Sequence, residues 1–480
     1  MPKILLNRLS HPIAFHIYKF LIPVLIGIMI YYIPRPLEIN DKGWKLLAIF
    51  SATIVGLVTK PLPMGGVSFI SLTASILFGV LDIKTQAFEG FSAGISWLIV
   101  VVFVVARGFI KTRLGDRIGY FFVKLFGKTT LGLSYSLMFT EMVIAPFIPS
   151  GIARSGGVIY PILKSITKAV SNANKSYSEK TIGSFLTMIC YQSNIISSAV
   201  FLTAMAANPI MQSMAANYSI NLTWSTWFLA ASVPGIVSAL LLPILLYTIY
   251  PPKLKEMTII QDLAKAELKK MGPISAHEWI MIGVFFSMLI GWIFGSSYGL
   301  DTTTIAFVGL SILMITHVIT LDDFISEKEA WHTFLWFGIL MVLASNLEGY
   351  GVIKFFSNSL ASNITHLSTG KAFATLMLVY IYSHYFFASI TTHVTAMYSA
   401  FLLISISIGV NPLVAALSLA FASSLQGCLT HYGTSSGAIY YATNYIPIST
   451  WWKLGFVISL FYIVVWVGIG YFWWPYLGIV

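Results

Sequence analysis

Two short polar clusters interrupt apolar stretches of this sequence, and their residue types suit the binding of a small anion. They are Pro149–Arg154 (PSGIAR) and Ala388–His393 (ASITTH). Hydroxyl and amide side chains are neutral donors, which bind carboxylate oxygens more weakly than a fixed cation does and so allow release. Two later stretches, Cys190–Ser198 and Cys428–Ser436, carry more such groups. The full set is Ser150, Ser193, Asn194, Ser197, Ser198, Ser389, Thr391, Thr392, Thr430, Thr434, Ser435 and Ser436.

Arg154 stands out because it is the one basic residue deep inside an apolar segment. An ionisable group inside a membrane is costly, and it indicates a functional site with a partner. Glu141, earlier in the same segment, is the candidate partner. Two interpretations stay open: a permanent Arg154–Glu141 pair that braces the segment, or an arginine that supplies positive potential to an anion site.

Histidines form the second set of candidates. His393 ends the second polar cluster and His431 lies among the later hydroxyls, so both are candidates for ligand contact, whereas His384 and His317 are expected to be structural. Glycine and serine within spans also permit close helix packing, which is the alternative reading of any single one. The sequence has no nucleotide-binding loop, metal-ligand spacing or nucleophile motif, so we expect no enzymatic activity, no cofactor and no metal.

Composition determines which elements must position these residues. Of the 480 residues 57% are hydrophobic and only 9% are charged, and the mean hydropathy is +0.83. Soluble domains carry about 25% charged residues, so a polytopic helical membrane protein is predicted. Predicted spans cover residues 16–33, 44–60, 63–81, 94–111, 178–206, 224–250, 277–296, 302–319, 331–348, 411–442 and 451–477.

Two further apolar segments, 129–168 and 369–409, contain the polar clusters at their centres, and we interpret them as re-entrant helical hairpins. The distribution of bases supports this reading of eleven crossings. With the N-terminus inside, 21 of the 28 Lys and Arg residues fall on the cytoplasmic side, six on the other side and Arg154 within. Membrane proteins keep such an excess on the cytoplasmic side. We therefore expect a cytoplasmic N-terminus and an extracellular C-terminus, and no nucleic-acid binding despite the net charge of +11.

The halves of the chain repeat one order: a span, an amphipathic surface helix (112–127 or 350–363), a hairpin and an interrupted span. Ser150 and Ser389 are 239 residues apart, and Cys190 and Cys428 are 238 apart. Five crossings separate the hairpins, so they enter from opposite sides and form an inverted-topology repeat. In such proteins the ligand site lies near the bilayer midplane, where the broken helices meet. Their N-termini carry a partial positive charge, which favours an anion.

The stretches PSGIARSGGVIYP (Pro149–Pro161), YFFASITTHVTAMYSAF (Tyr385–Phe401) and LTHYGTSSGAIYY (Leu429–Tyr441) resemble the divalent anion:sodium symporter family. The similarity is greatest to its citrate/succinate antiporter and plastid 2-oxoglutarate/malate translocator branch. The resemblance implies a homodimer, a scaffold domain and a mobile transport domain that works as an elevator. It also places substrate and sodium at Ser-Asn-Thr motifs of the hairpin tips. Here those motifs read Ser150-Gly151-Ile152 and Ser389-Ile390-Thr391, so Gly151, Ile152 and Ile390 join the candidate site residues.

Glycine and isoleucine supply no side-chain oxygen to a hard cation such as sodium. We therefore expect sodium-independent exchange of C4 and C5 dicarboxylates (2-oxoglutarate, malate, fumarate, succinate) in the cell membrane. A sodium- or proton-coupled dicarboxylate or citrate symporter is the alternative, and a channel without turnover is a more remote one. The expected divisions are scaffold and first arm 1–128, transport half 129–250, cytoplasmic connector 251–276, scaffold and second arm 277–363, and transport half 364–480.

Overall fold

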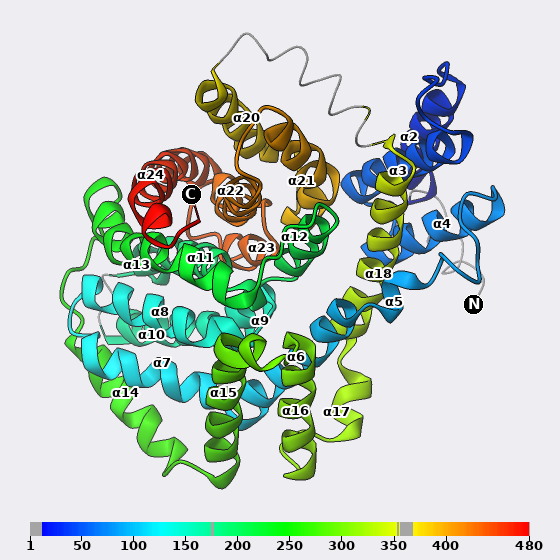
Figure 1. Cartoon of the computed structure of the whole chain (residues 1–480). Coiled ribbons are helices and arrows are strands. Elements are labelled where there is room, and N and C mark those ends of the chain that lie inside the picture. The colour runs from blue at the N-terminus through cyan, green and yellow to red at the C-terminus, as the bar shows by residue number, and fades with distance from the viewer. Residues whose placement is uncertain (1–11, 174–176, 353–354, 356–367, 480) are drawn as a thin grey trace, which may run out of the picture.

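The computed structural model of the chain describes residues 12–173, 177–352, 355 and 368–479 (Figure 1). Within these residues the protein is all-helical, and its one β-type pairing is an isolated bridge between Thr129 and Glu256. The α-helices are α2 Pro12–Tyr32, α3 Asp41–Thr59, α4 Met64–Leu77, α5 Glu89–Ser92, α6 Gly94–Thr112, α7 Leu114–Phe126, α8 Thr130–Ile144, α9 Gly151–Arg154, α10 Tyr160–Ala173, α11 Glu179–Val200, α12 Ala207–Ala216, α13 Trp224–Ile249, α14 Thr258–Met271, α15 Ala276–Phe294, α16 Thr302–Ile315, α17 Leu321–Ser326, α18 Lys328–Gly349, α20 Thr369–Ser383, α21 Ile390–Ser407, α22 Pro412–Leu425, α23 Ser435–Tyr441 and α24 Ile448–Tyr476.

Eight of the described helical segments are long and apolar enough to cross a bilayer, and three shorter apolar helices accompany them. Helices occupy every predicted span, so the prediction of an all-α membrane protein is confirmed. Two of the eight, α21 and the segment Pro412–Leu429, belong to elements that the sequence predicts to be a hairpin arm and an interrupted span. Eleven crossings therefore stay a prediction.

Both predicted hairpins consist of two helices that meet at a non-helical tip. Hairpin 1 runs from α8 through the tip Ile148–Ser150 into α9 and α10, with a π-helical turn at Ser155–Ile159. Proline disfavours helical backbone in the residue before it, and Ile148, which precedes Pro149, is extended with φ −114° and ψ 94°. Hairpin 2 runs from α20 through its tip into α21. In each hairpin a serine begins the second helix as its N-cap: Ser150 accepts from the Ala153 N–H and Ser389 from the Thr392 N–H.

The interrupted spans differ from each other more than the sequence predicts. The second breaks between α22 and α23, and Cys428 lies in the break itself, within the 3-10 turn Gln426–Leu429. In the first, α11 is continuous to Val200, and the break follows it before α12 resumes at Ala207. Cys190 is thus in the middle of an intact helix. The predicted equivalence of Cys190 and Cys428 is wrong, because the 238-residue spacing joins two different structural positions.

The hairpins and interrupted spans pack together crosswise. α11 and α22 contact each other at the centre of this body, which α13 and α24 flank (Figure 1). Hairpin 1 packs on α11, and α9, which directly follows its tip, contacts α23 of the second interrupted span. Hairpin 2 packs on α22, and α21 contacts α12 of the first. Each hairpin is therefore fitted between both halves of the chain, which brings the two tips toward one region.

A second group of helices lies beside this body. α6 packs against α16 and α18, and α18 also contacts α3 and α4. The amphipathic helix predicted at 112–127 is α7, whose residue Arg117 pairs with Glu278 of α15 at 2.5 Å. The connector helix α14 packs on α7 and α10, and the Met257 N–H donates to the Lys128 carbonyl at 2.8 Å. The predicted second arm, 350–363, lies mostly outside the described residues.

Candidate functional site

The tip of hairpin 1 is held to α11 by an asparagine in a fixed position. Asn194 donates from Nδ2 to the Gly151 carbonyl at 3.4 Å, and its Oδ1 accepts from Ser436 Oγ at 2.9 Å. A Cβ atom on Gly151 would lie only 2.8 Å from Asn194 Oδ1, which is closer than real Cβ contacts. Glycine is therefore required here by the close approach of backbone to asparagine. Asn194 connects hairpin 1 to α23 through Ser436.

The tip of hairpin 2 approaches the same break of the second interrupted span. The buried Ile390 side chain faces Gly427, where an added Cβ would lie 3.1 Å from Ile390 Cδ1 and 2.6 Å from Thr434 Cγ2. Thr434 is the N-cap of α23, and its Oγ1 accepts from the Gly437 N–H at 2.9 Å. The two predicted tip clusters thus converge on the break between α22 and α23, as the inverted repeat predicts.

Arg154 is fully buried and every one of its N–H groups has a partner. Its Nε donates to Glu141 Oε1 at 2.6 Å. Its two terminal nitrogens donate to four further oxygens: the carbonyls of Ile148 and Ala204, each at 2.5 Å, and Oγ of Ser198 and Ser197 at 2.9 and 3.4 Å. A guanidinium has five donors, so none is left for a ligand. This geometry supports the bracing interpretation: Arg154 ties the hairpin 1 tip to the break after α11.

Glu141 completes this arginine cage, by which we mean Arg154 and its five oxygen partners. Glu141 Oε1 accepts from three groups: Arg154 Nε, Asn194 Nδ2 at 2.7 Å and Ser197 Oγ at 3.1 Å. Its Oε2 is buried and has no hydrogen-bond partner among the described residues. Ser197 and Ser198, which the sequence offers as ligand donors, are engaged here by the ion pair.

His393 occupies in hairpin 2 the position that Arg154 occupies in hairpin 1, four residues after the capping serine. The ring is buried; its Nδ1 accepts from Gln426 Nε2 at 2.9 Å, which leaves Nε2 to carry the proton and donate to Ser383 Oγ at 2.8 Å. The ring is therefore neutral in this arrangement. His384, expected to be structural, bonds the Gly433 carbonyl at 3.1 Å.

The remaining predicted residues divide by exposure. Ser435 is exposed and Ile152 is 44% exposed, whereas Thr391 is half-buried and Thr392 is buried. The buried Thr430 Oγ1 has no partner among the described residues. His431 lies apart from this group: its Nδ1 accepts from Trp452 Nε1 at 3.3 Å and its ring lies 4.2 Å from that of Tyr441.

A cavity of about 130 Å³ lies against the hairpin 1 tip. Ser150 and Ile152 line it from the tip, and Arg107 lines it from α6. Arg107 is not among the predicted site residues, because a base near the end of a span predicts topology as readily as it predicts a site. Its place inside the apolar run 94–111 is the signal that could have identified it. The other lining residues are Phe103, Ala106, Ile110, Ile148, Ala153, Glu327 and Glu329.

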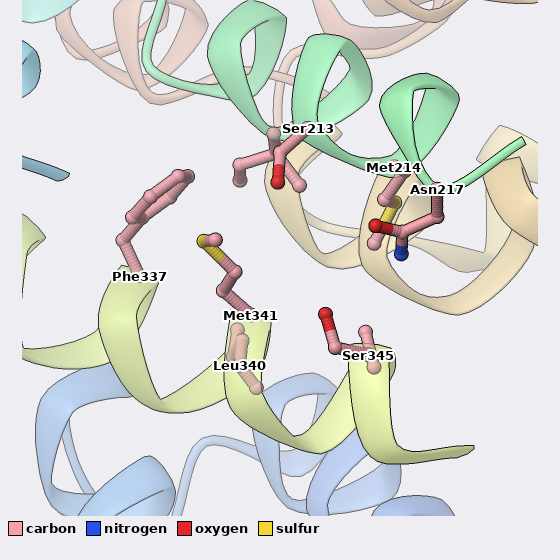
Figure 2. Close-up of a pocket in the computed structure, with 9 residues that line it drawn as sticks. Ser213, Met214, Asn217, Phe337, Leu340, Met341 and Ser345 are labelled. Carbon is pink, nitrogen blue, oxygen red and sulfur yellow. The ribbon is translucent and has the colours of Figure 1, made fainter. Parts of the chain in front are cut away.

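A much smaller hollow of about 10 Å³ separates α12 from α18. Figure 2 shows Ser213 and Met214 of α12, and Asn217 directly after it, facing Phe337, Met341 and Ser345 of α18 across the hollow. This volume holds about one water molecule. Most side chains that line this hollow are apolar, but Asn217 is also a side-chain hydrogen-bond partner of Glu348 in α18.

Residues 15–480 match the family described as "Sodium:sulfate symporter transmembrane region". The chain belongs to this family. It is therefore a membrane transporter and not an enzyme, and the predicted relationship to the divalent anion:sodium symporters is confirmed.

Relatives within the symporter family match along almost the whole chain. The chain is 45% identical over 467 residues to the "Putative malate transporter YflS" of Bacillus subtilis, which covers 97% of this chain and 98% of that one. It is 45% identical over 456 residues to the chloroplastic dicarboxylate transporter 1 of Arabidopsis thaliana (94% and 82%). It is 32% identical over 477 residues to the L-tartrate/succinate antiporter of Shigella flexneri (95% and 98%).

A solved structure shares the architecture at low sequence identity. The crystal structure of the YdaH transporter of Alcanivorax borkumensis matches with a TM-score of 0.56 at 12% identity, and the match covers 98% of both chains. At this identity the likeness shows the fold alone.

Proposed function

We propose that this transporter exchanges C4 and C5 dicarboxylates, such as malate, succinate, fumarate and 2-oxoglutarate, without sodium. The names of the relatives support a dicarboxylate as the substrate. Ser150 and Ser389, each capping a helix at a hairpin tip, and the half-buried Thr391 are the neutral donors that would bind the carboxylates. The Shigella relative is named an antiporter, which supports exchange.

The single observation that carries sodium independence is the arginine cage. A sodium ion needs several oxygen ligands. At hairpin 1, the oxygens that converge behind the tip belong to Glu141, Ile148, Ala204, Ser197 and Ser198, and all five accept hydrogen bonds from Arg154. The guanidinium of Arg154 thus occupies the oxygens that a sodium ion would need as ligands. In hairpin 2 the corresponding position holds His393, within bonding distance of Ser383 and Gln426.

The proposed cycle moves the hairpin body, within residues 129–250 and 364–480, as an elevator against a scaffold within 1–128 and 277–363, with 251–276 as the cytoplasmic connector. The hollow between α12 and α18 is lined mostly by apolar side chains (Figure 2), which supports sliding at that contact. The hydrogen bond between Asn217 and Glu348 would have to break in each cycle. We further propose a homodimer through the scaffold, a cytoplasmic N-terminus and an extracellular C-terminus in the cell membrane. The excess of bases on one side supports this orientation.

Proteoliposomes test the proposal directly. Vesicles loaded with unlabelled succinate should take up labelled succinate at the same rate in sodium and in potassium buffers, and empty vesicles should take up almost none. The family's description as sodium symporters supplies the competing candidate, a sodium-coupled symporter. Uptake into empty vesicles that requires an inward sodium gradient would establish that candidate and refute exchange.

A further inference from the structure

The cavity beside the hairpin 1 tip is lined by both polar and apolar side chains. Its volume of about 130 Å³ equals the space of several water molecules, which is enough for a C4 dicarboxylate. Ser150 of the tip and Ile152 of α9 line it, and so does Arg107 in the last two turns of α6. Glu327 and Glu329, at the start of α18, line it as well.

Arg107 is the basic group of this cavity, and it is neither buried nor fully engaged. Its Nη1 lies 3.3 Å from Glu327 Oε2 and its Nε 3.2 Å from Asp323 Oδ1, while its side chain is 35% exposed. Among the described residues, Nη2 has no hydrogen bond or ion pair. Partly exposed ion pairs contribute little to stability, so the contact with Glu327 can be exchanged for another carboxylate at small cost.

Asp323 has a different role in the same group of charges. Besides Arg107 it accepts from Lys111 Nζ at 2.6 Å and from the N–H of Thr320 at 2.9 Å. Burial raises the pKa of Asp323, but the hydrogen bonds from Lys111 and Thr320 outweigh burial and hold it well below its usual range. Asp323 therefore stays ionised and anchored, and Glu327 is the carboxylate that a ligand can replace.

We propose that Arg107 receives one carboxylate of the substrate in this cavity, displacing Glu327, and hands the dianion to the tip residue Ser150. Arg107 is thus a positioning and specificity residue for one face of the membrane, the face predicted to be cytoplasmic. This inference rests on the proposed dicarboxylate exchange. It predicts that a variant of Arg107 binds substrate more weakly from this face of the membrane and that substrate binding from the other face is unchanged.

The experiment measures half-saturating succinate concentrations in right-side-out and in inverted membrane vesicles, both loaded with saturating succinate. Because one charge-assisted bond is lost, Arg107→Gln should raise the value for the Arg107 face about tenfold and change the opposite face by less than about twofold. Lys111→Gln is the matched control: it removes the same charge one helical turn away, from a residue bound to Asp323 that does not line the cavity. Because Asp323 also pairs with Arg107, Lys111→Gln should raise the value for the Arg107 face less than Arg107→Gln does, and it should leave the opposite face unchanged.

Two acidic variants test displacement without removing Arg107. Glu327→Gln frees Arg107 and should lower the half-saturating concentration on its face, whereas Glu329→Gln removes an equal charge from the same cavity without touching Arg107 and should lower it less. Equal shifts on both faces, equal effects of Arg107→Gln and Lys111→Gln, or equal effects of the two Gln replacements at 327 and 329 would overturn the inference. If wild-type vesicles show no exchange at all, the proposed function fails instead. If Arg107→Gln does not fold, the comparison of Glu327→Gln with Glu329→Gln still tests whether the substrate displaces Glu327 from Arg107.

Discussion

Replacing Arg154 by alanine should destabilise the protein strongly, because Glu141 would stay buried without its countercharge. Both side chains are 0% exposed. Removing one partner of a buried ion pair typically costs about 3–5 kcal/mol, a large part of the 5–15 kcal/mol that typical folded proteins have in total. Among the residues that the structure describes, Asn194 and Ser197 alone would still donate to the Glu141 carboxylate. Chemical denaturation in detergent, followed by tryptophan fluorescence, measures the loss.

The matched control is Arg113→Ala. Arg113 also pairs with a carboxylate, Asp116 at 3.1 Å, but its side chain is 58% exposed, and exposed pairs contribute about 0–1 kcal/mol. Arg154→Lys is the intermediate case, since lysine keeps the charge and has three donors against five. A double replacement, Arg154→Ala with Glu141→Ala, should cost less than the two single changes added together, because no buried charge is left over.

One result would refute this reasoning, and a second would confirm the bracing role. If Arg154→Ala lowers the free energy of unfolding no more than Arg113→Ala, the cage does not stabilise the fold. If Arg154→Ala is as destabilised as expected and the residual folded protein exchanges succinate with unchanged half-saturation, the bracing interpretation is confirmed, and Arg154 has no part in anion binding.

Three further predictions concern the tips, one close contact and one carboxylate. Ser389→Ala or Thr391→Ala should raise the half-saturating substrate concentration by roughly two- to tenfold, since each removes one neutral donor worth about 0.5–1.5 kcal/mol, with a folded protein shown by size-exclusion chromatography. Gly427→Ala should lower the thermal midpoint, because its Cβ would meet Thr434 Cγ2 at 2.6 Å, whereas Gly283→Ala, with no atom within 4 Å, should not. Asp323→Asn should destabilise the protein at pH 7, and the difference should vanish in acid. The lowered pKa contributes stability that is fully present above the usual value of 3.8 and is lost as pH falls through the folded value.

The sequence predicts the hairpins well because their tips follow local rules. Pro149 restricts Ile148 to an extended backbone, and serine is a preferred N-cap, so Ser150 and Ser389 mark the starts of two helices from sequence alone. The 239-residue spacing of these serines also joins structurally equivalent positions. The cysteine spacing fails because nothing about a buried cysteine breaks a helix: Cys190 sits within α11, and only Cys428 lies in a break.

Interactions between distant segments lay beyond the sequence. The sequence at Ser197 and Ser198 is the same whether these side chains face a ligand or a guanidinium. Only the fold shows that Arg154 binds them. Arg107 was hidden for a related reason, since a base near the end of a span predicts topology as readily as a site. Its role depends on the hairpin tip lining the same cavity, a contact between segments more than forty residues apart.

The two hairpins avoid an unbalanced buried charge by different chemistry. Ser150, Arg154 and Glu141 correspond at a spacing of 239 residues to Ser389, His393 and Tyr380. In hairpin 1 the basic group is neutralised by a carboxylate; in hairpin 2 a neutral imidazole packs 4.6 Å from the tyrosine ring, whose hydroxyl bonds Ser423 at 2.7 Å. Neither hairpin therefore presents an unbalanced charge in this arrangement. Within the hairpins themselves, attraction for a dianion must then come from neutral donors and helix N-termini at the tips, while Arg107 of α6 faces the hairpin 1 tip from outside the hairpins. Such weak attraction suits the proposed exchange, since a permanent cation at the hairpin tip would bind the substrate too tightly for its release.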